Sequence, residues 1–126
     1  MKRDMELVRK VLLEVEELSI SPIDWLIDFR VEGYEEDLVN YHVWLLWQAG
    51  FLEAMEDNTM GDDFRCFPSA LRWEGVEFLE SIRDPKIWRQ TKAGVRKVGS
   101  AGLDIVWGLA KSYAKQQVAD KLGVVL

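Results

Sequence analysis

The segment EEDLVNYHVWLLWQAGFL, residues 35–52, is the longest strongly patterned apolar stretch in the first two-thirds of the chain. The acidic residues at its start suit the positive end of a helix dipole. Gly50 predicts the end of the helix, because glycine tolerates the left-handed conformation found there. We therefore expect a helix that ends at AGFL and leads into a strand. Helical spacing predicts its apolar face as Leu38, His42, Leu45, Leu46 and Ala49.

Extended runs follow this helix at residues 51–56 and 64–71, and the polar stretch between them predicts a hairpin. Pro68 limits the second run to an edge or irregular strand, because proline donates no ladder hydrogen bond. Before the central helix, residues 4–18 carry a helical apolar stripe, and residues 23–33 alternate as a strand would. A helix that leads into a hairpin is typical of the third helix and wing of a winged helix-turn-helix domain.

Three more helices are expected after the hairpin, over residues 73–82, 84–98 and 100–122. Asp84 suits a helix cap and Pro85 a first helical position, while Ser100 can cap the last helix. The predicted fold is α+β and mostly helical. It has a winged helix-turn-helix-like core with a short β-hairpin wing at residues 1–83. A C-terminal helical extension, residues 84–126, packs on that core or on a second protomer.

The composition favours one domain with an apolar core and a cytoplasmic location. Of the 126 residues, 48% are hydrophobic and six are tryptophan. The opening MKRDMELVRK is charged, unlike a secretory signal, and no apolar run reaches the roughly 20 residues needed to cross a bilayer. Cys66 is the only cysteine, which excludes an intramolecular disulfide and a cysteine-built zinc site.

The net charge of −6 conceals two parts of opposite sign. Residues 1–85 carry 8 Lys and Arg against 20 Asp and Glu, whereas residues 86–126 carry 8 against 2. These parts are expected either to meet, within one chain or between two copies, or to be separate solvated faces.

Four segments carry a pattern beyond helix periodicity. They are MKRDMELVRKVLLEVEE at the start, VEGY at residues 31–34, NYHVWLLWQAGFLEA in the centre and LRWEGVEFLESIRDPKIW at residues 71–88. Their most specific parts are MKRDM, the Tyr41–His42 pair followed by AGFL, and Trp73-Glu74-Gly75 with Phe78-Leu79. Together they resemble the bacterial and phage family catalogued as domain of unknown function 2513. The resemblance covers nearly the whole chain and implies a winged-helix fold with added C-terminal helices, without an established activity.

Two positions depart from the pattern of that family. Members usually carry a capping threonine before Trp-Glu-Gly, and Arg72 stands there instead, at a cost of about 1 kcal/mol. Members tend to have Gly-His where this chain has Gly75–Val76. A role that needs that histidine is therefore not expected in this protein.

No set of residues predicts catalysis, a metal site or a cofactor. His42 is the only histidine, and we expect it to be partly buried and bonded to a backbone carbonyl or a carboxylate, since no partner for a general base is evident. The acidic loop at residues 57–63 lacks the EF-hand spacing, and the chain has no P-loop. We therefore expect a protein that is not an enzyme and binds no cofactor.

The outer face of the central helix argues against base reading. It presents Asp37, Asn40, Tyr41, Trp44, Trp47 and Gln48. No Lys or Arg occurs between Val31 and Phe64, so the acidic core disfavours nucleic acid, which is held mainly through its phosphates. Trp44 and Trp47, about one turn apart, are expected to be anchors covered by the chain's own last helix or by a partner protein.

These observations predict a non-catalytic interaction module that forms a homodimer or binds a protein partner. A bacterial or prophage context follows from the resemblance alone. The expected partner-binding residues are Tyr41, Trp44, Trp47, Trp107 and Tyr113. The alternative is a DNA-binding transcriptional regulator that uses the basic residues Lys86, Arg89, Lys92, Arg96 and Lys97. The last helix could also lie on a membrane surface, although packing on the core or on a second copy is favoured.

Overall fold

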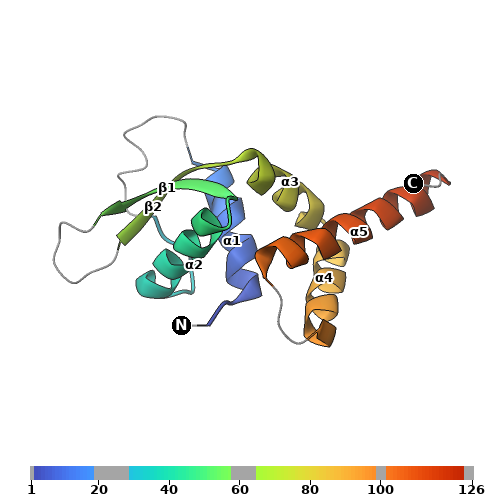
Figure 1. Ribbon diagram of the computed structural model, residues 1–126, viewed down its shortest axis with the longest axis horizontal. Helices are drawn as coiled ribbons and strands as arrows, with labels where there is room; N and C mark the ends of the chain where they lie inside the picture. Colours follow the sequence, from blue (N-terminus) through green and yellow to red (C-terminus); the bar gives the residue numbers. More distant parts are fainter. Residues whose placement is uncertain (1, 19–28, 58–64, 99–101, 124–126) are drawn as a thin grey trace. The chain divides into compact units, whose positions relative to one another are not determined.

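The computed structural model describes residues 2–18, 29–57, 65–98 and 102–123 (Figure 1). Its elements, in order, are α1 (Met5–Glu16), α2 (Glu36–Gln48), β1 (Leu52–Asp57), β2 (Arg65–Leu71), α3 (Trp73–Ile82), α4 (Pro85–Val98) and α5 (Leu103–Leu122). The predicted class, a mostly helical α+β fold with one hairpin, is confirmed. Backbone contacts group the chain into an N-terminal unit, Met1–Val76, and a C-terminal unit, Glu77–Leu126.

Helix α1 supplies one wall of the N-terminal core and begins close to the predicted residue. Its cap is Asp4, whose carboxylate accepts hydrogen bonds from the backbone N–H groups of Glu6 and Leu7. That carboxylate satisfies donors left open by the first helical turn. Its buried stripe is Leu7, Val8, Val11, Leu12 and Val15. Helix α1 packs on α2 and on β2.

Helix α2 is rotated relative to the predicted face. Leu38 and Leu45 are only half-buried and Ala49 is exposed, whereas Asn40, assigned to the outer face, is buried. The residues it buries are Val39, Asn40, His42, Val43 and Leu46. The prediction failed here because α2 packs against α1 and both strands, so its covered side is wider than one stripe.

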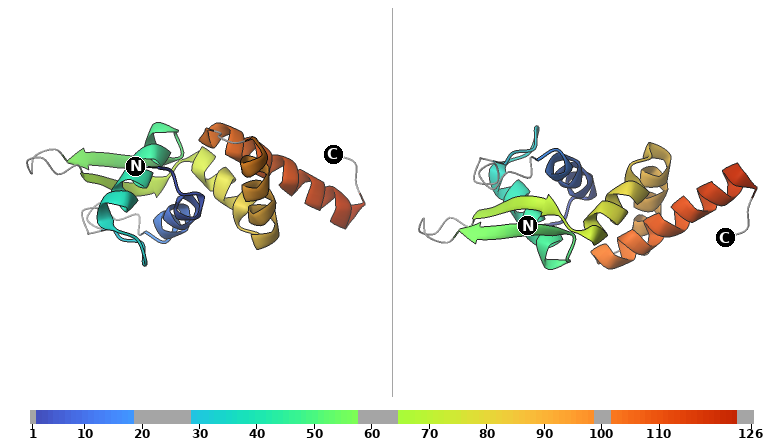
Figure 2. Two further views of the ribbon diagram at one scale, coloured as in Figure 1. Left: turned by 90° about the horizontal axis from the view of Figure 1, so that it is seen from below. Right: turned by 90° about the horizontal axis from the view of Figure 1, so that it is seen from above.

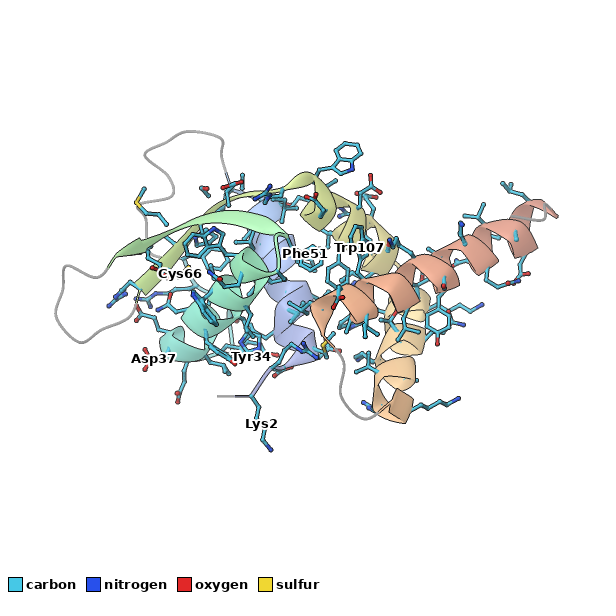
Figure 3. All side chains as sticks on the ribbon, in the orientation of Figure 1. Lys2, Tyr34, Asp37, Phe51, Cys66 and Trp107 are labelled. Atoms are coloured by element: carbon cyan, nitrogen blue, oxygen red, sulfur yellow. The ribbon has the colours of Figure 1, made fainter. Side chains whose placement is uncertain are left out.

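The end of α2 follows the prediction at Gly50, which has a φ of 86°. The N–H of Gly50 donates to the carbonyl of Trp47 at 3.0 Å, and the N–H of Phe51 donates to the carbonyl of Leu46 at 2.9 Å. This pair of hydrogen bonds is a Schellman motif, which reverses the chain directly into β1. Figure 3 marks Phe51 at this corner.

Strands β1 and β2 form an antiparallel hairpin (Figure 2). Its register runs from Leu52 opposite Leu71 to Asp57 opposite Arg65, with an irregularity between Glu53 and Ala54. Pro68 lies opposite Ala54, beside this irregularity, where a missing N–H is tolerated.

The expected strand at residues 23–33 is not found in its described part. Residues 29–31 have no regular structure and 32–34 form turns, while 23–28 lie outside the described residues. Within the described ranges the sheet therefore has two strands. The alternation that suggested a third strand instead places one apolar side chain, Val31, in a loop where it is 5% exposed.

The C-terminal unit pairs α4 with α5. Asp84 caps α4 as predicted, because its carboxylate accepts from the N–H of Lys86 at 2.8 Å and Pro85 opens the helix. Gly94 lies against the hydroxyl of Tyr113, which would be 2.8 Å from a Cβ placed there. Helix α5 has Gly102 as its cap rather than the predicted Ser100, which lies outside the described residues.

The apolar positions of α5 are buried only in its first half. Leu103, Val106 and Ala110 are buried, whereas Val118 and Leu122 are 44% and 69% exposed. The second half of α5 therefore presents apolar side chains to solvent.

Candidate functional site

The single histidine joins the two helices of the N-terminal core. His42 is fully buried, and its Nε2 accepts a hydrogen bond of 2.7 Å from the backbone N–H of Asp4. Its Nδ1 lies 2.8 Å from the carbonyl oxygen of Leu38, one turn earlier in α2. A carbonyl only accepts and an N–H only donates, so this geometry requires a neutral ring with its proton on Nδ1. The expectation of a buried histidine bonded to a backbone carbonyl matches this arrangement.

The electrostatics of His42 agree with this geometry. Burial lowers the pKa of His42 below its ordinary value, and the backbone hydrogen bond to Leu38 and the charge of Asp4 oppose that shift only in part. Both ring nitrogens already have partners. The ring therefore has no free lone pair with which to act as a general base or bind a metal.

A second contact joins the end of α2 to the start of α3. The carbonyl of Phe51 accepts a hydrogen bond of 3.0 Å from the N–H of Arg72. A Cβ on Gly75 would lie only 1.9 Å from that carbonyl oxygen, so a residue without a side chain is required there. Arg72 has an additional role, an exposed ion pair of 3.5 Å with Glu53 across the hairpin.

These two contacts join several of the motifs that carry the family resemblance. The opening MKRDM meets the Tyr41–His42 pair through Asp4, and AGFL meets Trp73-Glu74-Gly75 through the carbonyl of Phe51. Sequence reasoning did not identify Asp4 and Gly75 as partners of these groups. The available signal at position 75 was a glycine inside a helix, whereas Asp4 is simply a residue type favoured at helix caps. Through these contacts the motif residues hold α1, α2 and the start of α3 together.

An aromatic surface lies on α2 next to this core. Tyr41, Trp44 and Trp47 are each half-buried. The rings of Tyr41 and Trp44 stack with centroids 6.3 Å apart at 20°, and Tyr41 meets His42 edge-on at 5.5 Å. We call these three residues the α2 aromatic surface. At its edges, Asp37 and Gln48 are exposed.

The other two predicted partner-binding residues lie in the C-terminal unit. Tyr113 is half-buried and packs on Gly94 of α4, which gives it a role inside the unit. Trp107 is also half-buried, with the ammonium of Lys111 3.9 Å from its ring centre. A groove of about 590 Å³ runs along the same helix. Its lining residues are Ser81, Gly108, Lys111, Ser112, Ala114, Lys115 and Val118.

The five basic residues of the alternative prediction lie together on α4. Four of them are exposed, and Lys92 is half-buried with its ammonium 5.6 Å from the centre of the Trp88 ring. The apolar side of the same helix is buried at Ile87, Trp88 and Thr91. The two faces of α4 are thus cleanly separated.

The described residues offer little for metal or thiol chemistry. Among them, no three His, Cys, Asp or Glu side chains group as metal ligands would. Cys66 on β2 is 1% exposed, and burial raises the pKa of its thiol to about 12, which keeps it protonated (Figure 3). Most of the acidic loop 57–63 lies outside the described residues.

In the described ranges, no helix is both long enough and apolar enough to cross a membrane.

Comparison with known proteins agrees with the resemblance noted from the motifs. The profile of the family described as "Hypothetical protein (DUF2513)" matches residues 2–101. An uncharacterised protein of Haemophilus influenzae is 30% identical over 120 residues, which cover 94% of this chain and 100% of the relative. No solved structure matches the chain significantly. The chain therefore belongs to the DUF2513 family.

Proposed function

We propose that this protein is a non-catalytic interaction module of winged-helix type that self-associates through the α2 aromatic surface. The observation that carries the proposal is the cluster of Tyr41, Trp44 and Trp47, which keep part of their surface in solvent beside the exposed Gln48. Large aromatic side chains that are partly desolvated and pre-packed are the usual energetic centres of protein interfaces. Helix α2 contains no Lys or Arg that would indicate phosphate binding instead.

The remaining chemistry supports a binding role over an enzymatic one. His42 has both nitrogens engaged, and Cys66 is buried and protonated. A nucleophile or base must reach a substrate with the correct protonation state, and neither residue meets that requirement. The succession of α2 and hairpin supports the winged-helix assignment, and the Haemophilus relative supports a bacterial setting. A prophage origin remains part of the proposal.

The test is the oligomeric state of the Trp44→Gln/Trp47→Gln variant, measured by sedimentation velocity across a concentration series. The wild type should form a dimer. The variant should dissociate at least about 30-fold more readily, since a central aromatic anchor contributes roughly 2 kcal/mol. Gln48→Arg provides a second variant, because this exposed position can carry charge into the contact without disturbing the core.

A matched control is Trp73→Gln, which removes a tryptophan that is 74% exposed at the start of α3. Its oligomeric state should equal that of the wild type. A wild type that stays monomeric at all concentrations, or three variants that behave alike, would refute the proposal.

A DNA-binding transcriptional regulator is the second candidate. It is favoured by the separated basic face of α4, and it uses a different helix from the α2 aromatic surface. The two candidates are therefore separable by mutation.

A further inference from the structure

Helix α4 carries the densest positive charge in the chain. Residues 85–98 contain five Lys and Arg and no Asp or Glu. Lys86, Arg89, Arg96 and Lys97 are exposed. At about 100° per residue, the five basic positions occupy roughly 140° of the helix circumference. We call these five residues the α4 basic face.

The opposite side of α4 is closed by packing. Ile87 is 6% exposed, Trp88 4% and Thr91 0%. The hydroxyl of Thr91 donates to the carbonyl of Ile87 at 2.8 Å, so this buried polar group is satisfied within the helix. The orientation of α4 in its unit is therefore fixed by its apolar side, and the charged side is held outward.

Asp84 and Glu80, two carboxylates that precede α4 in the chain, are already engaged. Asp84 accepts hydrogen bonds from the N–H of Lys86 and from Nε2 of Gln117, which lower its pKa, the Gln117 bond most. Glu80 pairs with Arg83 at 2.8 Å. Within the described part of the chain, no ion pair involves the four exposed basic residues of α4.

We propose that the α4 basic face binds the phosphodiester backbone of nucleic acid without reading base sequence. Lys and Arg side chains that neutralise phosphates supply affinity that does not depend on base sequence, and α4 offers such side chains. Gln90 is the only exposed amide side chain on α4, so the helix has few groups suited to reading bases. The net charge of −6 does not oppose this strongly, since charges farther than about 10 Å are screened at 0.1 M salt. This inference goes beyond the proposed self-association and gives the second candidate a defined ligand chemistry.

The packing of α4 favours nucleic acid over a lipid bilayer. Helices that lie on membranes insert an apolar face below the headgroups. The apolar face of α4 is already buried in the protein, which leaves only the charged face to meet a ligand. The distance from Lys86 to Lys97 is about 16 Å along the helix, and that length of duplex axis carries roughly ten phosphate charges.

The test is fluorescence anisotropy of a labelled random-sequence DNA duplex and of a labelled single-stranded RNA, each titrated with the full chain at 50 and 200 mM salt. Four phosphate contacts predict a slope near −3.6 in a plot of log affinity against log salt, or roughly 150-fold weaker binding at the higher salt. The Lys86→Gln/Arg89→Gln/Arg96→Gln variant should bind at least about 100-fold more weakly at 50 mM salt, with a slope near −1. Comparing the affinities for the DNA duplex and for the single-stranded RNA shows which of the two nucleic acids binds more tightly.

The matched control removes the same charge from exposed positions on α5, in the variant Lys111→Gln/Lys115→Gln/Lys121→Gln. It should bind within about threefold of the wild type, and circular dichroism should be the same for all three proteins. Absence of wild-type binding at 50 mM salt would overturn the inference.

Two further results would also overturn it. Equal losses in the two variants would show that α4 is not the site. Binding to phosphatidylglycerol vesicles that depends on α4, without nucleic-acid binding, would assign the face to a membrane. Self-association of the α4 variant should be unchanged, so this test fails or succeeds independently of the one on Trp44 and Trp47.

Discussion

His42 shows how one side chain can tie a helix start to a neighbouring helix. The N–H of Asp4 precedes α1 and has no partner within that helix, and the imidazole supplies one from α2. Protonation would place an N–H on Nε2 opposite another N–H and abolish this hydrogen bond. The charged residues that face the ring are Asp4 and Arg3, both from the N-terminus of α1.

The lowered pKa of His42 predicts that the protein loses stability on acidification. The unfolded chain binds a proton near the ordinary pKa of 6.5, whereas the folded chain resists protonation to lower pH. The stability that neutral His42 contributes to the fold is therefore complete above pH 6.5. It declines as the pH falls toward the pKa of His42 in the folded chain, by at most about 1.4 kcal/mol per pH unit. Urea unfolding at pH 7.5 and 5.5 measures this difference.

The variant His42→Gln isolates the effect, because its amide oxygen can accept from Asp4 and does not titrate. Its free energy of unfolding should depend less on pH than that of the wild type over this interval. An equal dependence in both proteins would show that other groups cause the acid sensitivity.

At the scale of elements, the corner between α2, β1 and α3 depends on a backbone contact. Gly75 lets the first turn of α3 lie against the carbonyl of Phe51. That carbonyl also accepts a hydrogen bond from the N–H of Arg72. Three elements are thereby fixed at one carbonyl group. Arg72, which precedes α3, also forms the exposed ion pair with Glu53.

The substitution Gly75→Ala should destabilise the protein by roughly 1–3 kcal/mol, because the new Cβ meets backbone that cannot rotate away. Gly108→Ala is the matched control, since it adds the same methyl group inside α5, where the new Cβ meets no neighbouring atom within 4 Å. That change should be neutral or stabilise by up to about 1 kcal/mol. The free energy of unfolding of each variant is measured in urea. Equal changes in the two variants would contradict the assigned role of Gly75.

At the scale of the whole molecule, the described structure consists of two units that share α3. Cys66 reports on the N-terminal unit alone, because it lies on β2, which packs on α1 and α2. The C-terminal unit has no cysteine. The thiol therefore offers a local probe that needs no added label.

Cys66 should react with a disulfide reagent at pH 8 at least 100-fold more slowly in the native protein than in urea. Burial and a pKa of about 12 leave almost no accessible thiolate. The opening free energy derived from native-state labelling should equal that of unfolding the N-terminal unit, because β2 is exposed only when its core opens. A markedly smaller value would show that the hairpin separates from α1 and α2 locally.

Local signals in the sequence determined the helices, the hairpin and the helix ends at Gly50 and Asp84. The caps at Asp84 and Gly50 and the apolar periods act over four or five residues, so they are readable without a structure. The same locality explains why the hairpin was placed within one residue of β1 and β2. The family resemblance was also carried by sequence alone.

Tertiary packing decided which face of α2 is buried, the partner of His42 and the need for glycine at position 75. Asp4 and His42 are 38 positions apart, and no local pattern specifies that they meet. The side of α2 that is buried depends on the combined packing of α1 and the hairpin against it. This packing buries Asn40 and leaves Ala49 exposed. Period and propensity define an element, but the direction in which it packs is a property of all its neighbours at once.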